Sequence, residues 1–334
     1  MKNLIAFTLV SNNHLVYAKT LHDSFKKFHP DFIFYTGLID EYHPDINYND
    51  LIFLNIISYK DINCDFFEEM INNYSIAEFS WSLKPFFSEY LLNKFGRESK
   101  LVYLDSDLFF CGRIDAVLDK LDVFNMVLTP HLTQPTDFFS IEEQTALIHG
   151  IYNMGFFGIK YSAESFKFLK WWKIRLRTHC ITDKLNGLTG DQKWMNLSNL
   201  FFKDIHVLMH QGYNVAFWNI NERVLIKQDN KFFINSLSQE LIFFHFSGFD
   251  PFDENYFGKL KFEKYSYKNR IDIIEISNIF KAAILTNGYN DLKNLIPINK
   301  YADKNKILEN NNFKHISFKS KIKNYLVSKI KNLL

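Results

Sequence analysis

Cysteine is scarce in this chain of 334 residues, and its three copies stand far apart, at positions 64, 111 and 180. An odd number at such spacings excludes a disulfide framework and offers no zinc-ligand pattern. Long apolar runs are also missing, since none approaches the roughly 18 to 20 residues of a membrane-spanning helix. The run Leu4–Val10 ends in polar residues without a small-residue cleavage site, so we expect a first β-strand there and no signal peptide. These absences favour a cytoplasmic protein.

Net charge is small as well, but it is the sum of two unlike parts. The 39 basic and 37 acidic residues give +2, yet residues 314–334 contain six lysines and no acid, so the rest carries 33 − 37 = −4. An acidic body argues against nucleic-acid binding, which spreads basic residues over a face. In the tail, apolar residues from Phe318 to Leu333 fall on one helical face opposite the lysines. This pattern predicts a basic amphipathic helix that binds an anionic membrane surface.

The chain is 47% hydrophobic, and its first half alternates strand-like with helix-like segments. Predicted strands are Leu4–Val10, Phe32–Ile39, Leu51–Ile57, Lys100–Leu104, Met126–Thr129 and Tyr152–Ile159. Predicted helices include Val16–Phe28, Phe79–Phe95 and Ala163–Arg177. In the second of these, Pro85 is tolerable if the helix begins near Ser82 or Lys84. Repeated βα units indicate an α/β fold: an open, mostly parallel sheet with helices on both faces. We expect an α/β domain over 1–250, a helical extension over 251–312 and the basic tail over 313–334.

Two acidic residues follow a predicted strand in Asp105-Ser106-Asp107. The carboxyl ends of parallel strands are where open α/β sheets bind ligands, and two carboxylates there can hold a divalent cation with room for phosphate oxygens. A solvated turn is the alternative interpretation. His245 ends another apolar strand, where an imidazole would complete a mixed oxygen and nitrogen shell that Mn²⁺ tolerates. Its alternative is a core histidine.

Further polar residues stand beside glycines. Asp191-Gln192 follows Gly190 and places a carboxylate and an amide at a helix start, where an ordinary N-cap is the alternative. Asn153 lies two residues before Gly155, in a strand that needs close backbone approach. Trp218 fits core packing better than a sugar-binding platform.

Taken in order, these motifs resemble glycosyltransferase family 8 of the GT-A fold, the glycogenin and bacterial lipopolysaccharide galactosyltransferase type. The resemblance covers about residues 4 to 252 and extends to a bacterial group of predicted glycosyltransferases. The segments that carry it are 77–90, 103–107, 128–132, 150–156, 191–194, 212–219 and 244–249.

The resemblance implies roles for individual residues. Asp105, Asp107 and His245 would bind Mn²⁺ or Mg²⁺ at the diphosphate of the donor, whereas Asp191 and Gln192 would act at the sugar, with retention of its configuration. The residues expected to contact the nucleotide sugar are Thr8, Val10, Ser11, Asn12, Asp40, Lys84, Ser106, Asn153 and Gly248. The family often has a lysine soon after the late glycine, whereas here Phe249-Asp250-Pro251 follows, so Lys84, the metal or backbone amides would bind phosphate.

The resulting hypothesis is a cytoplasmic, metal-dependent glycosyltransferase, peripherally bound to the inner face of the membrane. It would move a sugar from a nucleotide sugar, UDP-linked by preference, to a bacterial surface glycan or lipid-linked glycan acceptor. One alternative is a nucleotidyltransferase that forms the sugar nucleotide, although that chemistry needs a glycine-rich basic loop where Ser11-Asn12-Asn13-His14 stands. Another is a catalytically silent subunit that binds sugar nucleotides or glycans.

Overall fold

A computed structural model of the chain describes residues 3–62, 64–135 and 140–302. The basic tail expected over 313–334, and with it the predicted membrane contact, lies outside these ranges. Within them, no helix has both the length and the apolar character needed to cross a membrane.

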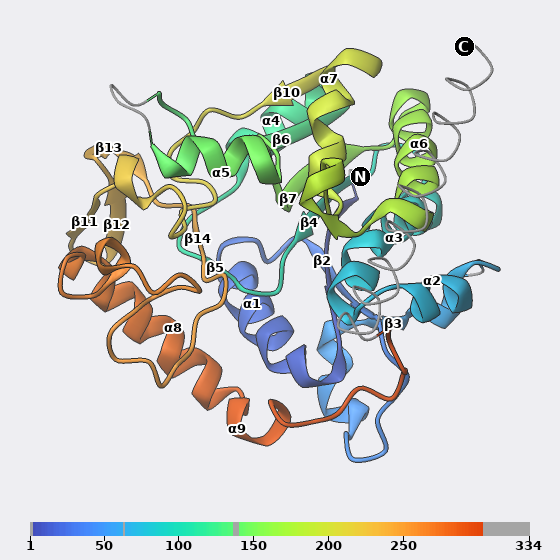
Figure 1. The fold of residues 1–334 in the computed structure, drawn as a ribbon, viewed down its shortest axis with the longest axis horizontal. Helices are drawn as coiled ribbons and strands as arrows, with labels where there is room; N and C mark the ends of the chain where they lie inside the picture. The colour runs from blue at the N-terminus through green and yellow to red at the C-terminus, as the bar shows by residue number, and fades with distance from the viewer. Residues whose placement is uncertain (1–2, 63, 136–139, 303–334) are drawn as a thin grey trace, which may run out of the picture.

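A seven-stranded sheet forms the centre of the described part, with the strand order β10-β6-β7-β4-β1-β2-β3. Strand β7 runs antiparallel to both of its neighbours, and the other adjacent pairs are parallel. Helices cover both faces (Figure 1), so the predicted α/β class with an open, mostly parallel sheet is confirmed. The strands of this sheet are β1 Leu4–Val10, β2 Ile33–Leu38, β3 Ile56–Ser58, β4 Lys100–Leu104, β6 Met126–Pro130, β7 Tyr152–Lys160 and β10 Ile205–Val207.

Three small sheets and the helices complete the architecture. The short strands are β5 Leu108–Phe110 with β14 Phe243–His245, β8 Thr182–Asp183 with β9 Leu188–Thr189, and β11 Leu225–Gln228, β12 Lys231–Ile234 and β13 Ser236–Glu240. The α-helices are α1 Leu15–Phe28, α2 Phe67–Asn73, α3 Ile76–Phe95, α4 Asp115–Val123, α5 Ile141–His149, α6 Ala163–His179, α7 Ser198–Phe201, α8 Ile274–Thr286 and α9 Tyr289–Leu292. The 3₁₀ helices are η1 Asn12–His14, η2 Tyr48–Leu54, η3 Tyr59–Asp61, η4 Lys184–Asn186, η5 Gln192–Leu197, η6 Ile220–Glu222, η7 Glu263–Tyr265 and η8 Ile271–Ile273.

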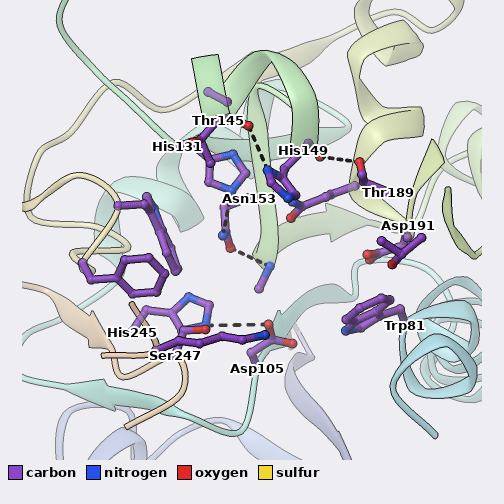
Figure 2. A pocket seen from close by; sticks show the side chains of 18 of the residues that line it. Trp81, Asp105, His131, Thr145, His149, Asn153, Thr189, Asp191, His245 and Ser247 are labelled. Carbon is purple, nitrogen blue, oxygen red and sulfur yellow. Dashed lines mark hydrogen bonds and ion pairs between the residues drawn. The ribbon is translucent and has the colours of Figure 1, made fainter. Parts of the chain in front are cut away.

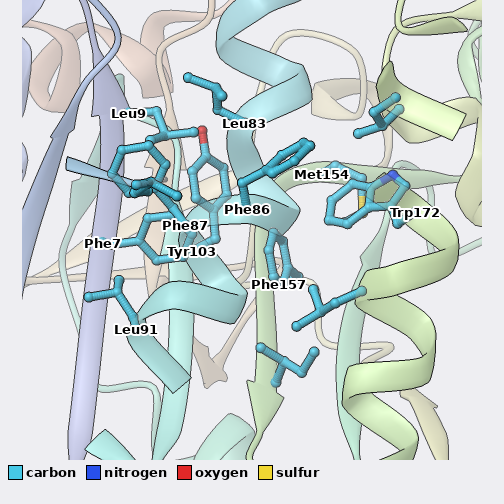
Figure 3. Packing of buried hydrophobic residues seen from close by; sticks show 14 of the residues in the cluster. Phe7, Leu9, Leu83, Phe86, Phe87, Leu91, Tyr103, Met154, Phe157 and Trp172 are labelled. Atoms are coloured by element: carbon cyan, nitrogen blue, oxygen red, sulfur yellow. The ribbon is translucent and has the colours of Figure 1, made fainter. Parts of the chain in front are cut away.

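Helix α3 begins at Ile76, earlier than the start near Ser82 or Lys84 that Pro85 suggested. Ser75 and Glu78 form a capping box that fixes the first turn. Pro85 lies inside the helix, where its missing N–H removes one bond to the preceding turn. Burial outweighs that loss, because α3 presents a row of apolar side chains to the sheet (Figure 3).

The run Leu51–Ile57 is the other segment that the sequence misassigned. Most of it belongs to η2, and only Ile56–Ser58 enters the sheet as β3. The side chain of Asn47 accepts a hydrogen bond from the backbone N–H of Asn49, and Asn55 turns the chain with a φ of 45°. A short apolar run does not by itself distinguish a buried strand from a buried helical turn. Here the polar residues Asn47 and Asn55 favour the helical turn.

Helix α8 lies beyond the boundary expected at residue 250, but its apolar residues share one cluster with residues before that point. Phe280 stacks on Phe246 with ring centroids 4.1 Å apart, and Ile276 and Ile284 belong to the same cluster. The division at 250 therefore stays a prediction, while the packing joins both sides of it.

Candidate active site

Three strand ends bring Asp105, Asp107 and His245 together, a group that we call the triad. Asp105 follows β4 and Asp107 precedes β5, and β14 pairs with β5 so that His245 lies opposite Leu108. One ligand atom from each of the three side chains lies within 4.8 Å of the others. His245 Nε2 is 3.0 Å from Asp107 Oδ1 and 3.8 Å from Asp105 Oδ2, and Figure 2 shows His245 and Asp105 facing each other.

Asn214 sets the orientation of the His245 ring. Its Oδ1 accepts a hydrogen bond from His245 Nδ1 at 2.8 Å, and its Nδ2 donates to Thr129 Oγ1 at 3.1 Å. An amide oxygen only accepts, so Nδ1 carries a proton and Nε2 points to the carboxylates. Burial lowers the pKa of His245, but the carboxylates of Asp107 and Asp105 outweigh it and raise that pKa overall.

Gly155 on β7 forms the floor of the triad. A Cβ at this position would lie 2.5 Å from His245 Cε1 and 2.7 Å from Asp105 Oδ2, and the Gly155 carbonyl accepts the backbone N–H of Asp105 at 2.7 Å. The expectation that this strand needs close backbone approach is therefore confirmed. Two carboxylates and a directed imidazole nitrogen are the donor set of a Mn²⁺ or Mg²⁺ site with mixed ligands, so the residues present fit such an ion.

Lys84 and Asp191 form a buried ion pair beside the triad. Lys84 Nζ donates to Asp191 Oδ2 at 2.8 Å and to the Met154 carbonyl at 2.9 Å, and it lies 3.8 Å from Asp105 Oδ1. Asp191 precedes η5, but its side chain makes no capping hydrogen bond there, so the N-cap alternative fails. Burial lowers the pKa of Lys84, whereas Asp191 and Asp105 raise it and prevail. Lys84 is thus a neutralising partner of Asp191.

Two cavities meet at the triad, and both are lined by Asp105, Asp107 and Trp81. The first, of about 570 Å³, is the one drawn in Figure 2. The sequence-predicted residues in it are Lys84, Asn153, Asp191, Gln192 and His245. The second, of about 400 Å³, lies over the ends of β1 and β4, and its sequence-predicted residues are Val10, Ser11, Ser106 and Gly248.

Thr8, Asn12 and Asp40 line neither cavity. The side chain of Thr8 is fully buried and lies on the face of β1 that packs with α1, because it alternates with the inward neighbours Ala6 and Val10 of that cluster. Asn12 Nδ2 donates to Asp40 Oδ2 at 3.0 Å, and neither residue is more than 1% exposed. The structure therefore places these three residues inside the fold, where none of them lines either cavity.

Sequence reasoning missed several residues of the site. Trp218, expected in the core, lines the first cavity, and its ring lies edge-on to His245 with centroids 4.9 Å apart. His131 lines it too, and burial lowers its pKa to about 4, so its neutral Nε2 accepts from Asn153 Nδ2 at 3.1 Å. Asn214 stood inside a motif that carried the resemblance, but nothing in the sequence marked it as the partner of His245.

Lys259 is the missed residue with the clearest chemistry. It comes eleven positions after Gly248 in the sequence, yet a Cβ on Gly248 would lie 2.6 Å from Lys259 Cβ. Its exposed side chain lines the first cavity together with the triad. The sequence lacks the lysine that family 8 members often have soon after this glycine, and Lys259 from a later loop lies next to Gly248.

No family model matches the chain. Among proteins of known sequence, it is similar to two from Bacillus subtilis (strain 168). It is 26% identical over 259 residues to "Uncharacterized protein YfnD", an alignment that covers 75% of this chain and 79% of YfnD. It is 24% identical over 246 residues to "Uncharacterized protein YfnF", with 72% and 80% covered.

The solved structures to which the chain is similar include two glycosyltransferases. One is the galactosyltransferase LgtC in complex with donor and acceptor sugar analogues, with 14% identity, a TM-score of 0.48, and 88% of this chain and 98% of LgtC covered. Another is the glycosyltransferase GlyE of Streptococcus pneumoniae TIGR4, with 16% identity, a TM-score of 0.45, and 87% and 64% covered.

Proposed function

We propose that the protein is a metal-dependent glycosyltransferase that moves a sugar from a nucleoside diphosphate sugar, a UDP-sugar by preference, to a glycan acceptor with retention of configuration. The observation that carries the proposal is the meeting of two cavities at the triad. A donor consists of a nucleoside and a sugar on either side of a diphosphate. The triad would bind the metal at the diphosphate, and the two cavities on either side of it would receive the sugar and the nucleoside.

A divalent cation held by Asp105, Asp107 and His245 would neutralise charge that develops on the departing diphosphate. The side chains of the first cavity bind and orient the sugar. Asp191 would accept hydrogen bonds from sugar hydroxyls, Asn153 would donate to them through Nδ2, and Gln192 would lie beside the anomeric carbon. Asp191 is held in one orientation by Lys84, which favours a positioning role over that of a free nucleophile.

The reaction then proceeds on one face of the sugar. The bond between the anomeric carbon and the phosphate oxygen breaks, and a bond from the anomeric carbon to the acceptor oxygen forms on the same side. The proton of the acceptor hydroxyl goes to the departing phosphate, so no separate carboxylate base is required.

Lys259 supplies the cation for the donor's diphosphate in this proposal. With a divalent ion, the two triad carboxylates balance its charge, and Lys84 is neutralised by Asp191, so two negative charges of the diphosphate stay uncompensated. Lys259 is exposed and lines the cavity that contains the triad. An ammonium group at a diphosphate forms strong, charge-assisted hydrogen bonds.

The acceptor in this proposal is a bacterial surface glycan or its lipid-linked precursor. The support is the composition of residues 314–334, whose six lysines and apolar face suit the inner face of an anionic membrane. Such a location would place the site next to a membrane-bound acceptor.

The experiment that tests the function incubates the full chain with a panel of nucleotide sugars, Mn²⁺ and glycan acceptors. We expect release of a nucleoside diphosphate and a new glycosidic bond whose anomeric configuration, read by NMR, matches the donor. Asp107→Asn is the control that leaves the fold in place and removes one ligand charge.

Other outcomes identify the alternatives. Release of pyrophosphate from a nucleoside triphosphate and a sugar phosphate would show a nucleotidyltransferase. Binding of nucleotide sugars without turnover of any acceptor would indicate a silent binding subunit. Inversion at the anomeric carbon would overturn the mechanism while leaving the class intact.

A further inference from the structure

The last described segment of the chain, residues 295–302, crosses the edge of the second cavity, and we call it the C-terminal strap. In Figure 1 it continues from α9 and ends beside β3. Pro297 lines the cavity together with Ile39 and Val10, and the triad carboxylates Asp105 and Asp107 line it as well. The strap is therefore part of the cavity wall, although Ile298 and the Asp40 carboxylate that it contacts are 258 positions apart in the sequence.

Asp40 is the anchor of the strap. Its Oδ1 accepts the backbone N–H of Asn299 at 2.9 Å and its Oδ2 accepts that of Ile298 at 3.1 Å. The same carboxylate accepts the backbone N–H of Glu41 and the amide of Asn12. A fully buried carboxylate with four N–H donors is well compensated, and hydrogen bonds to a charged acceptor are strong. The bond to Asn12 stiffens the anchor from the end of β1.

Further contacts fix the strap on both sides of Pro297. Tyr301 donates its hydroxyl hydrogen to the Ile39 carbonyl at 2.6 Å, and Ala302 donates its backbone N–H to the Tyr74 carbonyl at 2.9 Å. Before the strap, the ring of Tyr289 lies edge-on to Tyr17 with centroids 6.0 Å apart, and Tyr17 lines the same cavity. These contacts hold the strap in one position at the ends of β1 and β2.

The position of the strap along the sheet indicates which part of a ligand it meets. Asp105 follows β4, and β1 separates β4 from β2, whose end leads to Asp40. Two strand spacings amount to roughly 10 Å. A ligand whose phosphates lie at the triad would extend over β1 toward the strap with its nucleoside. Apolar side chains that line this cavity include Ile39 and, from α3, Ile76 and Ala77.

From these contacts we infer that the C-terminal strap forms the wall of a nucleoside subsite, in which Pro297 packs against the nucleoside and Asp40 acts as the positioning residue. The inference rests on the proposed function, because it takes the ligand to be a nucleoside diphosphate. It also explains why Asn12 and Asp40 stand where the sequence suggested nucleotide contacts: they build the subsite through the strap and do not touch the ligand.

The test compares ligands that differ by the nucleoside alone. Binding of UDP and of inorganic pyrophosphate, each with Mn²⁺, is measured by calorimetry on the full chain. For Pro297→Ala we expect about fivefold weaker UDP binding, because apolar contact is lost, and unchanged pyrophosphate binding. Ile296→Ala is the matched control, since Ile296 is 78% exposed and does not line the cavity. Its affinities should equal those of the wild type.

Two anchor variants extend the test. Asp40→Asn places an amide opposite the backbone N–H groups, and we expect a loss of UDP affinity of about tenfold or more, with pyrophosphate again unchanged. Tyr301→Phe removes two hydrogen bonds of the hydroxyl, the one it donates to Ile39 and the longer one it accepts from Asn299 Nδ2, and should weaken UDP binding about threefold. If Asp40→Asn does not fold, Pro297→Ala and Tyr301→Phe still decide the question, because neither disturbs a buried charge.

The results separate the inference from the function on which it rests. Wild-type affinity for UDP in Pro297→Ala would overturn the strap's role, and so would a parallel loss of pyrophosphate binding, which would show a general effect on the fold. Failure of the wild-type chain to bind any nucleoside diphosphate with Mn²⁺ would instead overturn the proposed function, and the inference with it.

Discussion

Two charged clusters lie side by side in the first cavity, and their carboxylates differ in exposure and in charged partner. In the triad, the side chains of Asp105 and Asp107 stay 28% and 27% exposed and face a histidine. In the neighbouring pair, the Asp191 side chain is 6% exposed and already has Lys84 as its cation. This difference supports the proposal that the triad receives a cation, whereas the pair already contains one in Lys84.

The largest expected effect is on the triad. Asp107→Asn preserves the shape of the side chain but removes the charge that would hold the metal, and we expect transferase activity to fall by about a hundredfold or more. The measurement is the initial rate of nucleoside diphosphate release at saturating Mn²⁺. Activity within threefold of the wild type would contradict a metal-binding role for the triad, and with it the proposed difference from the Lys84–Asp191 pair.

The pair should respond chiefly in stability. Lys84→Met leaves the Asp191 carboxylate buried without its cation, so the free energy of unfolding should decrease by about 3 to 5 kcal/mol. The double variant Lys84→Met with Asp191→Asn removes the stranded charge and should recover part of the loss. Urea unfolding measures both. A double variant no more stable than the single one would contradict the pairing.

Addition of Mn²⁺ should distinguish the two clusters, because we expect the ion to bind only at the triad. An ion that binds the folded state alone contributes about 2.7 kcal/mol at a hundredfold excess over its dissociation constant, so the melting temperature of the wild type should rise. Asp191→Asn should show the same rise, and Asp107→Asn should show none. An equal loss of the shift in both variants would place the ion between the clusters.

The smallest effect concerns the contact between Gly248 and Lys259 at the margin of the triad. Gly248→Ala adds strain at a φ of +67° and a collision with Lys259, whereas Gly187→Ala adds similar strain at +76° with nothing within 4 Å. We expect each to cost about 1 to 2 kcal/mol of stability. Pyrophosphate affinity should fall only in Gly248→Ala, and equal affinities in the two would argue against Lys259 as a phosphate ligand.

The triad was predictable because each member ends or begins an apolar strand. The carboxyl ends of parallel strands converge on one edge, so a site was expected at Asp105 and Asp107 after β4. His245 was expected to join them as the end of another apolar strand, and it does so through β14, which pairs antiparallel with β5 in a separate small sheet. The alternation of strand-like and helix-like segments predicted the sheet itself. The assignment of elements from apolar runs and proline was wrong at two places. Leu51–Ile57 is mostly helical because of polar turn residues, and α3 begins earlier than Pro85 suggested because of a capping box.

Pairings between distant segments were not predictable in this way. Lys84 and Asp191 are 107 positions apart and meet through the packing of α3 against the segment that leads into η5. Lys259 reaches Gly248 from a loop, and the strap reaches Asp40 from 258 positions away. A sequence shows which side chains bear charge, but the packing of helices and loops decides which charges are neutralised internally and which stay available.

The central claim is that the triad binds a divalent cation at the diphosphate of a nucleotide-sugar donor. The most direct measurement is a crystal structure of the chain with Mn²⁺ and UDP, with the ion located by its anomalous scattering. The account predicts one Mn²⁺ ion with Asp105, Asp107 and His245 as ligands and in contact with the diphosphate. Mn²⁺ bound elsewhere, or UDP bound away from the triad, would contradict it.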